Sequence, residues 1–388
     1  MMDIKALTRD ELVAWLKQRK QPAYRADQVL RWLYQQRVIS WAAMRNLPAS
    51  LREELAGHFT LHCASLVTRQ GANDRTRKFL WKLADEALIE SVLIPANPAL
   101  YGEQSDRHTL CLSTQVGCAY GCRFCASGLA GWKRNLSADE IIEQVLATER
   151  WHAAESARVR EAAASHSSGA LPGKGSAAPA RLVDNIVVMG MGEPLANYDN
   201  LMRAVRILNA PWGGGIGARK ITISTSGLVP EIRRLAEEPL QVGLAISLHG
   251  ATDEVRGRLM PINRRYPLKE LTSACQYYLE RKGRILTFEY ILIAGVNDTP
   301  SDAQTLAALA RRLRAKVNLI PYNRVEGLPW ERPEEPAQRA FWQVLLRSGV
   351  NATLRHEKGH DIDAACGQLR LRTERSAGAL GLPQVNAG

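Results

Sequence analysis

The stretch Gly117-Cys-Ala-Tyr-Gly-Cys-Arg-Phe-Cys125 decides the fold and chemistry expected of this chain, because it places Cys118, Cys122 and Cys125 in one short loop. The loop follows a predicted strand over residues 110–114. A structural zinc site uses four ligands, commonly in two Cys-x-x-Cys pairs, and the sequence holds no second pair. An electron-transfer [4Fe–4S] cluster uses four thiolates. Three thiolates therefore predict a [4Fe–4S] cluster in which one iron has no protein ligand.

An iron without a protein ligand can chelate the amine and carboxylate groups of S-adenosylmethionine (SAM). An electron supplied to such a cluster cleaves the sulfonium of SAM and yields a 5′-deoxyadenosyl radical. This is the chemistry of radical SAM enzymes, and the cysteine spacing predicts it here.

Further motifs fit a SAM site. Gly190-Met-Gly-Glu-Pro194 follows a strand expected over residues 185–189. Its glycines let the backbone approach a ligand closely, and Glu193 can accept a hydrogen bond from an ammonium group. Three other polar segments follow later strands, namely Ser224-Thr-Ser-Gly227, Ser247-Leu-His249 and Asn323. Each is weak evidence alone, but together they predict one rim of groups suited to ribose, carboxylate and adenine.

From Leu110 onward, expected strands and helices alternate, which predicts an α/β fold with a parallel sheet. The number of repeats favours a partial barrel of the (βα)6 type, whose functional residues gather at the carboxyl ends of the strands. The expected strands are 110–114, 185–189, 220–224, 242–247, 286–293, 316–320 and 350–354. The expected helices lie near 137–152, 199–209, 229–238, 267–282, 301–314 and 335–347.

The chain divides into four expected segments. Residues 1–60 form a helical module, in which Thr8 and Glu11 predict a capping box. Residues 61–104 supply short linking strands, with a hairpin around Asp85-Glu86. The barrel core covers residues 105–355, and the C-terminal segment covers 356–388. Within the core, residues 153–180 are rich in Ala, Ser, Gly and Pro and predict a flexible surface insertion, whose first part could extend the preceding helix.

Net charge, apolar runs and the number of cysteines indicate which partners and which cellular compartment to expect. Lys and Arg outnumber Asp and Glu by 51 to 39, and the net charge of +12 favours a polyanion such as RNA or DNA, although a solvated basic surface fits as well. No apolar run approaches the roughly 20 residues needed to span a bilayer. The seven cysteines are an odd number with three clustered, which is a poor disulfide framework. We therefore expect a cytoplasmic protein without a membrane anchor.

Two further cysteines carry a resemblance to a known family. Cys111 lies seven residues before the cluster motif, and Cys366 lies in Asp361-Ile-Asp-Ala-Ala-Cys-Gly-Gln-Leu369. Taken with the preceding motifs and Ile89-Glu-Ser-Val92, these segments resemble the RlmN family of radical SAM enzymes over nearly the whole chain. That family methylates carbon 2 of adenine in 23S rRNA and in tRNA.

The resemblance implies a role for each unusual residue. Cys366 takes a methyl group from one SAM, and the radical from a second SAM abstracts hydrogen from that S-methyl group. The carbon radical adds to adenine and leaves a protein–RNA crosslink. Glu90 matches the base that removes the ring proton, although without the family it reads as an exposed strand glutamate. Cys111 matches the thiol that attacks Cys366, which releases the product and leaves a transient disulfide.

The resemblance also implies the cofactors and partners. The SAM-contacting positions of the family match Gly192, Glu193, Ser224, Ser247, Leu248, His249 and Asn323. The cofactors are a [4Fe–4S] cluster and two SAM molecules per turnover. The expected partners are 23S rRNA, tRNA and an electron donor such as flavodoxin or ferredoxin, and the expected state is a monomer. The N-terminal module matches the RNA-engaging domain, and the insertion at 153–180 is longer than the family leads us to expect.

Two alternatives remain open from the sequence. A Cfr-type methyltransferase, which modifies carbon 8 of the same rRNA adenine, shares the cluster and both reactive cysteines, although Asp363 favours the RlmN family. A non-catalytic metal-binding RNA-binding protein would need a fourth ligand near the cluster loop, and none is evident.

Overall fold

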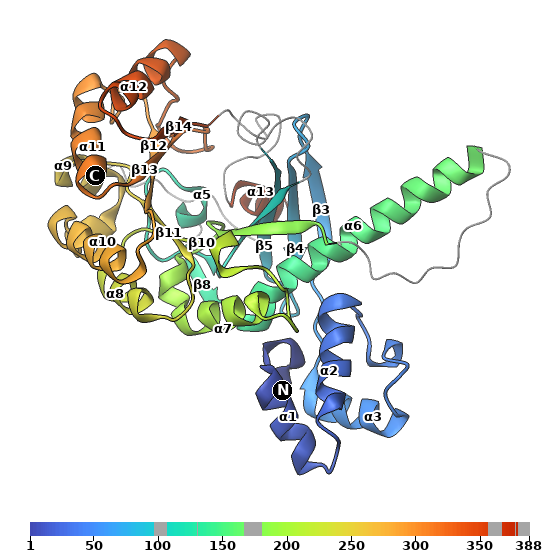
Figure 1. Ribbon diagram of the computed structural model, residues 1–388. Coiled ribbons are helices and arrows are strands. Elements are labelled where there is room, and N and C mark those ends of the chain that lie inside the picture. The colour runs from blue at the N-terminus through green and yellow to red at the C-terminus, as the bar shows by residue number, and fades with distance from the viewer. Residues whose placement is uncertain (97–106, 130, 167–180, 356–366, 377, 379–388) are drawn as a thin grey trace.

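The computed structural model in Figure 1 describes residues 1–96, 107–129, 131–166, 181–355, 367–376 and 378. Its main feature is a ten-stranded sheet with the order β14-β13-β12-β11-β10-β9-β6-β5-β4-β3. Neighbouring strands from β6 to β14 pair in parallel, and β3 to β6 pair antiparallel. The linking strands are therefore continuous with the barrel sheet rather than a separate layer.

The parallel strands lie close to where the sequence predicts them. They are β6 (His108–Leu112), β9 (Val183–Val188), β10 (Ile221–Thr225), β11 (Gly243–Ser247), β12 (Thr287–Leu292), β13 (Lys316–Pro321) and β14 (Ala352–Leu354). The antiparallel strands are β3 (Ser65–Gly71), β4 (Arg77–Lys82) and β5 (Leu88–Pro95). The predicted hairpin at Asp85-Glu86 is confirmed, since β4 and β5 pair on either side of it.

Helices cover the outer face of the parallel strands (Figure 1). They are α6 (Ala138–His166), α7 (Tyr198–Asn209), α8 (Val229–Glu237), α9 (Asp253–Leu259), α10 (Leu268–Lys282), α11 (Pro300–Arg312) and α12 (Glu335–Arg347). Local signals set their ends: Thr299 and Asp302 form a capping box for α11, and α10 ends at Gly283 with φ of 58°. The α/β alternation predicted from the sequence is confirmed.

One helix continues beyond its expected range of 137–152, along the extension that the sequence allowed for the first part of the insertion. The helix expected to end near residue 152 continues to His166, so the first half of the predicted flexible insertion is helix α6. Alanine is frequent over residues 153–166, and its high helix propensity explains the extension. Figure 1 shows this part of α6 projecting away from the sheet. Residues 167–180 lie outside the described part of the chain.

The N-terminal module is helical, as predicted. It comprises α1 (Arg9–Gln18), α2 (Tyr24–Leu30) and α3 (Ala49–His58), and it is closed by parallel pairing of β1 (Met2–Asp3) with β2 (Phe59–Thr60). Thr8 and Glu11 form both bonds of the predicted capping box. None of the helices in the described residues combines the length and apolarity of a bilayer span.

A buried ionic group joins this module to the barrel. The ammonium of Lys5 lies 3.2 Å from the carboxylate of Glu143 on α6 and 3.5 Å from that of Asp3, and all three side chains are buried. A second pair, Glu11 with Arg203 on α7, crosses the same junction at 2.8 Å but is partly exposed. The first contact is the stronger constraint, because buried charges left without a partner are costly.

Replacement of these two residues should therefore have unequal effects. Lys5→Met leaves the buried carboxylate of Asp3 without its cation and leaves Glu143 paired with Arg150 alone, and we expect the free energy of unfolding to fall by about 3 kcal/mol. Glu11→Gln removes a partly exposed pair while keeping an acceptor for the cap, and we expect a loss below about 1 kcal/mol. Denaturant unfolding of the cluster-free protein measures both values. Equal small losses would show that Lys5 does not hold the junction.

Candidate active site at the carboxyl ends of the strands

A cavity of about 580 Å³ opens at the carboxyl ends of the parallel strands. It brings together segments that are far apart in the sequence: the cluster loop, the Gly-Met-Gly-Glu-Pro turn, and the ends of β10, β11 and β13. Among its lining residues are the predicted site residues Cys111, Cys118, Cys122, Cys125, Gly192, Glu193, Ser224, Ser247, His249 and Asn323. The convergence expected from the strand ends is therefore present.

A small hairpin closes the cluster loop. Strands β7 (Gln115–Gly117) and β8 (Trp132–Asn135) pair antiparallel on either side of the loop, and the amide of Cys118 donates to the carbonyl of Gly131 at 3.1 Å. Gly117 has φ of 80°, and a Cβ there would lie 1.8 Å from the Gly131 carbonyl oxygen. Only glycine fits at this position, for steric and conformational reasons together.

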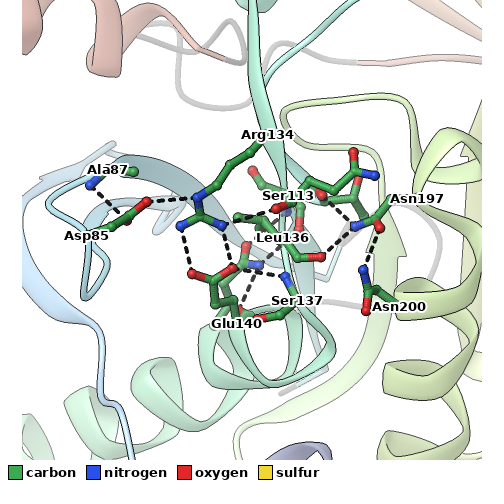
Figure 2. A network of polar contacts seen from close by, with 12 residues as sticks. Asp85, Ala87, Ser113, Arg134, Leu136, Ser137, Glu140, Asn197 and Asn200 are labelled. Atoms are coloured by element: carbon green, nitrogen blue, oxygen red, sulfur yellow. Dashed lines mark hydrogen bonds and ion pairs between the residues drawn. The ribbon is translucent and has the colours of Figure 1, made fainter. Parts of the chain in front are cut away.

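Arg134 fixes this hairpin to the rest of the barrel. Figure 2 shows its guanidinium between two carboxylates, Asp85 at 2.8 Å and Glu140 at 2.7 Å. Glu140 also accepts from the amide of Ser137 at the start of α6, at 2.9 Å. Hydrogen bonding to Glu140 raises the pKa of Arg134. The pairs tie β8 to both the β4–β5 turn and α6, so the cluster loop is held from two sides.

The three loop cysteines fit a cluster. Their thiols face the same cavity and are partly exposed to it. Burial, followed by the neighbouring thiols, raises the pKa of Cys122, and burial raises the pKa of Cys118 to about 12. Such thiols become thiolates readily only when bound metal supplies the compensating positive charge.

The turn carrying Glu193 is clipped directly to the segment before the cluster loop. The amide of Gly190 donates to the Leu112 carbonyl and that of Glu193 to the Gln115 side chain, both at 2.9 Å. Gly192 has φ of 98°, and a Cβ there would lie 2.6 Å from that of Gln115. These glycines were expected to let the backbone approach a ligand closely. The close approach in the structure is to the backbone segment 112–115, and it fixes Glu193 relative to the cluster loop.

Glu193 is buried and its carboxylate links two strand ends. It accepts from the amide of Ser226 at 2.7 Å and from that of Leu195 at 3.0 Å. Burial raises the pKa of this carboxyl, although these bonds oppose the effect. Each carboxylate oxygen has a second lone pair, so Glu193 can still accept from an ammonium in the cavity.

The remaining predicted SAM positions divide into two groups. Ser224 and Ser247 lie 3.3 Å apart on adjacent strands, and they line the cavity with His249 and Asn323. A buried oxygen of Asn323 has no hydrogen-bond partner among the residues that the structure describes, so it can accept a hydrogen bond from a ligand. Leu248 is different, because its side chain is fully buried in the core and does not line the cavity.

The ring of His249 is held in one tautomer. Its Nδ1 accepts from the amide of Ile291 at 3.1 Å, so the proton of the neutral ring must be on Nε2. Its ring lies edge-on to Phe124 of the cluster loop, with centroids 4.8 Å apart. Burial lowers the pKa of His249 to about 3, so the ring is a neutral hydrogen-bond donor at the cavity wall.

The structure adds a site residue that the sequence analysis missed. Glu289 on β12 lines the cavity; one carboxylate oxygen accepts from Asn318 at 3.1 Å, and the other is buried without a partner. Burial raises its pKa. The available signal was the single charged residue in the apolar strand segment Phe288-Glu-Tyr-Ile-Leu292.

Glu90 is buried rather than exposed, so its default reading as an exposed strand glutamate is wrong. Its carboxylate lies 2.9 Å from the ammonium of Lys78 and accepts from the amides of Gly367 and Arg370, each at 2.7 Å. It thereby caps helix α13 (Gln368–Ser376), as a carboxylate at a helix N-terminus does. Cys366, which immediately precedes Gly367, lies outside the described residues.

The parallel α/β sheet and the three-cysteine loop facing its carboxyl edge define a radical SAM enzyme. Residues 177–307 match the model of the radical SAM superfamily. Residues 2–61 match that of the ribosomal RNA large subunit methyltransferase N-terminal domain.

Relatives cover almost the whole chain. The chain is 53% identical to the probable dual-specificity RNA methyltransferase RlmN 3 of Opitutus terrae, over 95% of this chain and 94% of that protein. It is 49% identical to the probable RlmN of Akkermansia muciniphila, over 96% of each. The crystal structure of a radical SAM methyltransferase from Sphaerobacter thermophilus superposes with a TM-score of 0.82 at 44% identity, covering 95% of this chain and 99% of that one. The chain belongs to the RlmN family of radical SAM RNA methyltransferases, and its cofactors are a [4Fe–4S] cluster and SAM.

Gly117 offers a test of the loop closure. Gly117→Ala forces the new methyl group onto the Gly131 carbonyl, so we expect the iron bound after anaerobic reconstitution to fall by more than half. Gly121→Ala is the matched control, because φ is also positive (60°) but nothing lies within 4 Å of its added carbon. It should cost only the backbone strain of about 1–2 kcal/mol and keep most of its iron. If both variants lost the same fraction of bound iron, the contact between the added methyl group and the Gly131 carbonyl would not be the cause.

His249 offers a pH test. The unfolded ring takes up a proton near pH 6.5, whereas the folded ring does so only near pH 3, so this residue loses stabilising effect as pH falls through that window. His249→Asn keeps an acceptor for the Ile291 amide but cannot titrate. Between about pH 6 and 4 we expect the unfolding free energy of the cluster-free variant to depend less steeply on pH, by up to about 1.4 kcal/mol per unit. If the unfolding free energies of the wild type and of His249→Asn changed with pH in parallel, the lowered pKa of His249 would be contradicted.

Proposed function

We propose that this enzyme methylates carbon 2 of adenine, in the peptidyl-transferase centre of 23S rRNA and beside the anticodon of some tRNAs. One observation carries the proposal: Cys111 lines the same cavity as the three cluster cysteines, while Glu90 binds the backbone directly after Cys366. The dual-specificity RNA methyltransferase names of the relatives support the choice of RNA substrates.

Carbon 2 of adenine is electron-poor and carries no lone pair, so it cannot attack the methyl group of SAM. The bound cofactors supply a radical that makes such a carbon reachable. Cys366 takes the methyl group as a thiolate, displacing S-adenosylhomocysteine, and presents it in the cavity as an S-methyl thioether. Loss of one hydrogen atom from this methyl group gives a carbon radical, which forms the new bond to adenine and leaves the base joined to the protein.

Glu90 and Cys111 complete the reaction. Glu90 receives the proton from the methylated carbon of the ring, and the unpaired electron left on the ring would return to the iron–sulfur cluster, so the ring becomes aromatic again. Cys111 then attacks the sulfur of Cys366 as a thiolate. The bond between that sulfur and the methylene carbon breaks, and the carbon takes up a proton from solvent to become the methyl group. Methylated RNA leaves, and a disulfide joins the two cysteines until an external reductant restores both thiols. The carboxylate of Glu90 lies 2.9 Å from the ammonium of Lys78, and it accepts from the amide of Gly367, the residue that follows Cys366 in the sequence.

The charge and the cavity suit an RNA base. Arg332 and Arg355 are among the lining residues, and the chain carries a net charge of +12. A base must leave its stack to enter such a cavity, so folded or single-stranded RNA is the expected form of the substrate. We assign RNA docking to the N-terminal module, electron supply to a flavodoxin- or ferredoxin-like protein, and the activity to a monomer in the cytoplasm.

The two reactive cysteines give a direct test. Cys111→Ala removes the resolving thiol, so we expect protein reconstituted with iron, sulfide and SAM to accumulate covalently bound RNA. Cys366→Ala removes the methyl carrier and should bind no RNA covalently, and neither variant should release more than a few per cent of the wild-type product. Denaturing gel electrophoresis with labelled rRNA fragment measures the crosslink.

Cys63→Ala is the control, because that thiol does not line the cavity and should leave the product yield unchanged. Normal methylation by both reactive-site variants would overturn the two-cysteine mechanism. The Cfr-type alternative predicts methylation of carbon 8, and NMR of the product adenosine distinguishes the positions; a carbon-8 product would refute the carbon-2 proposal.

A further inference from the structure

Arg256 on α9 is a fully buried cation with few partners. Its relative exposure is 0%, and it donates one hydrogen bond to the side chain of Asn263 at 2.7 Å and one to the carbonyl of Ser226. Its Nε is buried without a hydrogen-bond partner. No carboxylate of the described residues pairs directly with this guanidinium. A buried arginine without an anion costs several kcal/mol, so this position calls for a negative charge nearby.

The acidic side chain closest along the helix does not supply that charge. Asp253 is exposed to solvent, and its carboxylate accepts from the Asn263 side chain and from the amide of Leu268. Cys122 attracts the guanidinium more strongly than Asp253 does, once its thiol has become a thiolate. Burial nevertheless lowers the pKa of Arg256 to about 10. The arginine therefore remains charged at neutral pH and is poorly compensated by the protein alone.

Helix α9 also packs against the cluster loop. The carbonyl of Leu259 at its end accepts from the amide of Arg123 at 2.9 Å, one residue beyond Cys122. The three cluster thiolates outweigh the positive charge of the iron–sulfur core, so the bound cluster is an anion and becomes more negative when it gains an electron. The cluster thus supplies the charge that Arg256 lacks.

We propose that Arg256 is the buried counter-cation of the iron–sulfur cluster and that its charge makes the cluster easier to reduce. The second buried cysteine near it, Cys275, does not compete for this role, because burial raises its pKa to about 12 and keeps it a neutral thiol. The proposal rests on the cofactor of this site and not on which carbon of adenine is methylated.

The first test is a reduction potential. Clusters reconstituted without SAM or RNA are titrated anaerobically with dithionite, and the reduced form is followed by EPR, which reports only protein that holds a cluster. In Arg256→Met we expect the ratio of reduced to oxidised cluster at a fixed potential to fall on the order of tenfold, which is about 59 mV for one electron. Arg256→Lys keeps the charge and should stay within about twofold of the wild type.

Arg264→Met is the matched control, because this arginine lies on the segment just after α9 but is exposed to solvent, so its charge is screened. Its cluster should reduce as in the wild type. A potential of Arg256→Met that coincides with the wild-type value would overturn the proposal.

The second test compares melting temperatures, and part of it uses protein without the iron–sulfur cluster. Without the cluster, a lone buried charge destabilises the fold, so cluster-free Arg256→Met should melt no lower than cluster-free wild type. Cluster binding should then raise the melting temperature of the wild type by more than that of the variant. If Arg256 only bridges Ser226 and Asn263, the variant loses stability with and without the cluster, and this result would also overturn the proposal.

Discussion

Partly buried thiols around one cavity are the constraint on which the rest of this site depends. Cys118, Cys122 and Cys125 line one cavity in surroundings that raise the pKa of Cys118 and Cys122, and metal binding stabilises such groups as thiolates. A loop that must hold three such groups has to be rigid before the cluster arrives. Gly117, the β7–β8 pairing and the Arg134 ion pairs provide that rigidity from the protein side.

Hydrogen bonds also link the cluster loop to the residues expected to bind SAM. The turn carrying Glu193 is bonded to the segment that enters the cluster loop, so the two groups expected to hold SAM cannot move independently. The buried guanidinium of Arg256 donates to the carbonyl of Ser226, whose amide in turn donates to Glu193. Glu90 plays a similar part for another segment, because it accepts from the amides of Gly367 and Arg370 and so fixes the start of α13.

Much of this arrangement follows from local sequence. Strand and helix periodicity predicted all seven parallel strands within a few residues, and the capping box at Thr8 and Glu11 formed as expected. The cysteine spacing predicted the cofactor, because three thiolates in one loop suit a [4Fe–4S] cluster with one iron left open for SAM. The end of α6 was misplaced, since alanine-rich sequence is compatible with both a helix and a flexible segment, and propensity alone does not decide between them.

The sequence by itself therefore determined the class of fold, and it predicted the three cluster cysteines and a set of polar strand ends that line the cavity, because these depend on periodicity and on motifs within one loop. Only the tertiary structure decided the environments of Glu90, Glu289 and Arg256. Without the resemblance to the family, the sequence predicted that Glu90 is an exposed strand residue. It predicted no role for Glu289 or Arg256. Their burial and charge partners arise from contacts between distant segments, such as Glu90 with Gly367, and the electrostatic free energy of a side chain depends on those contacts rather than on its neighbours in the chain.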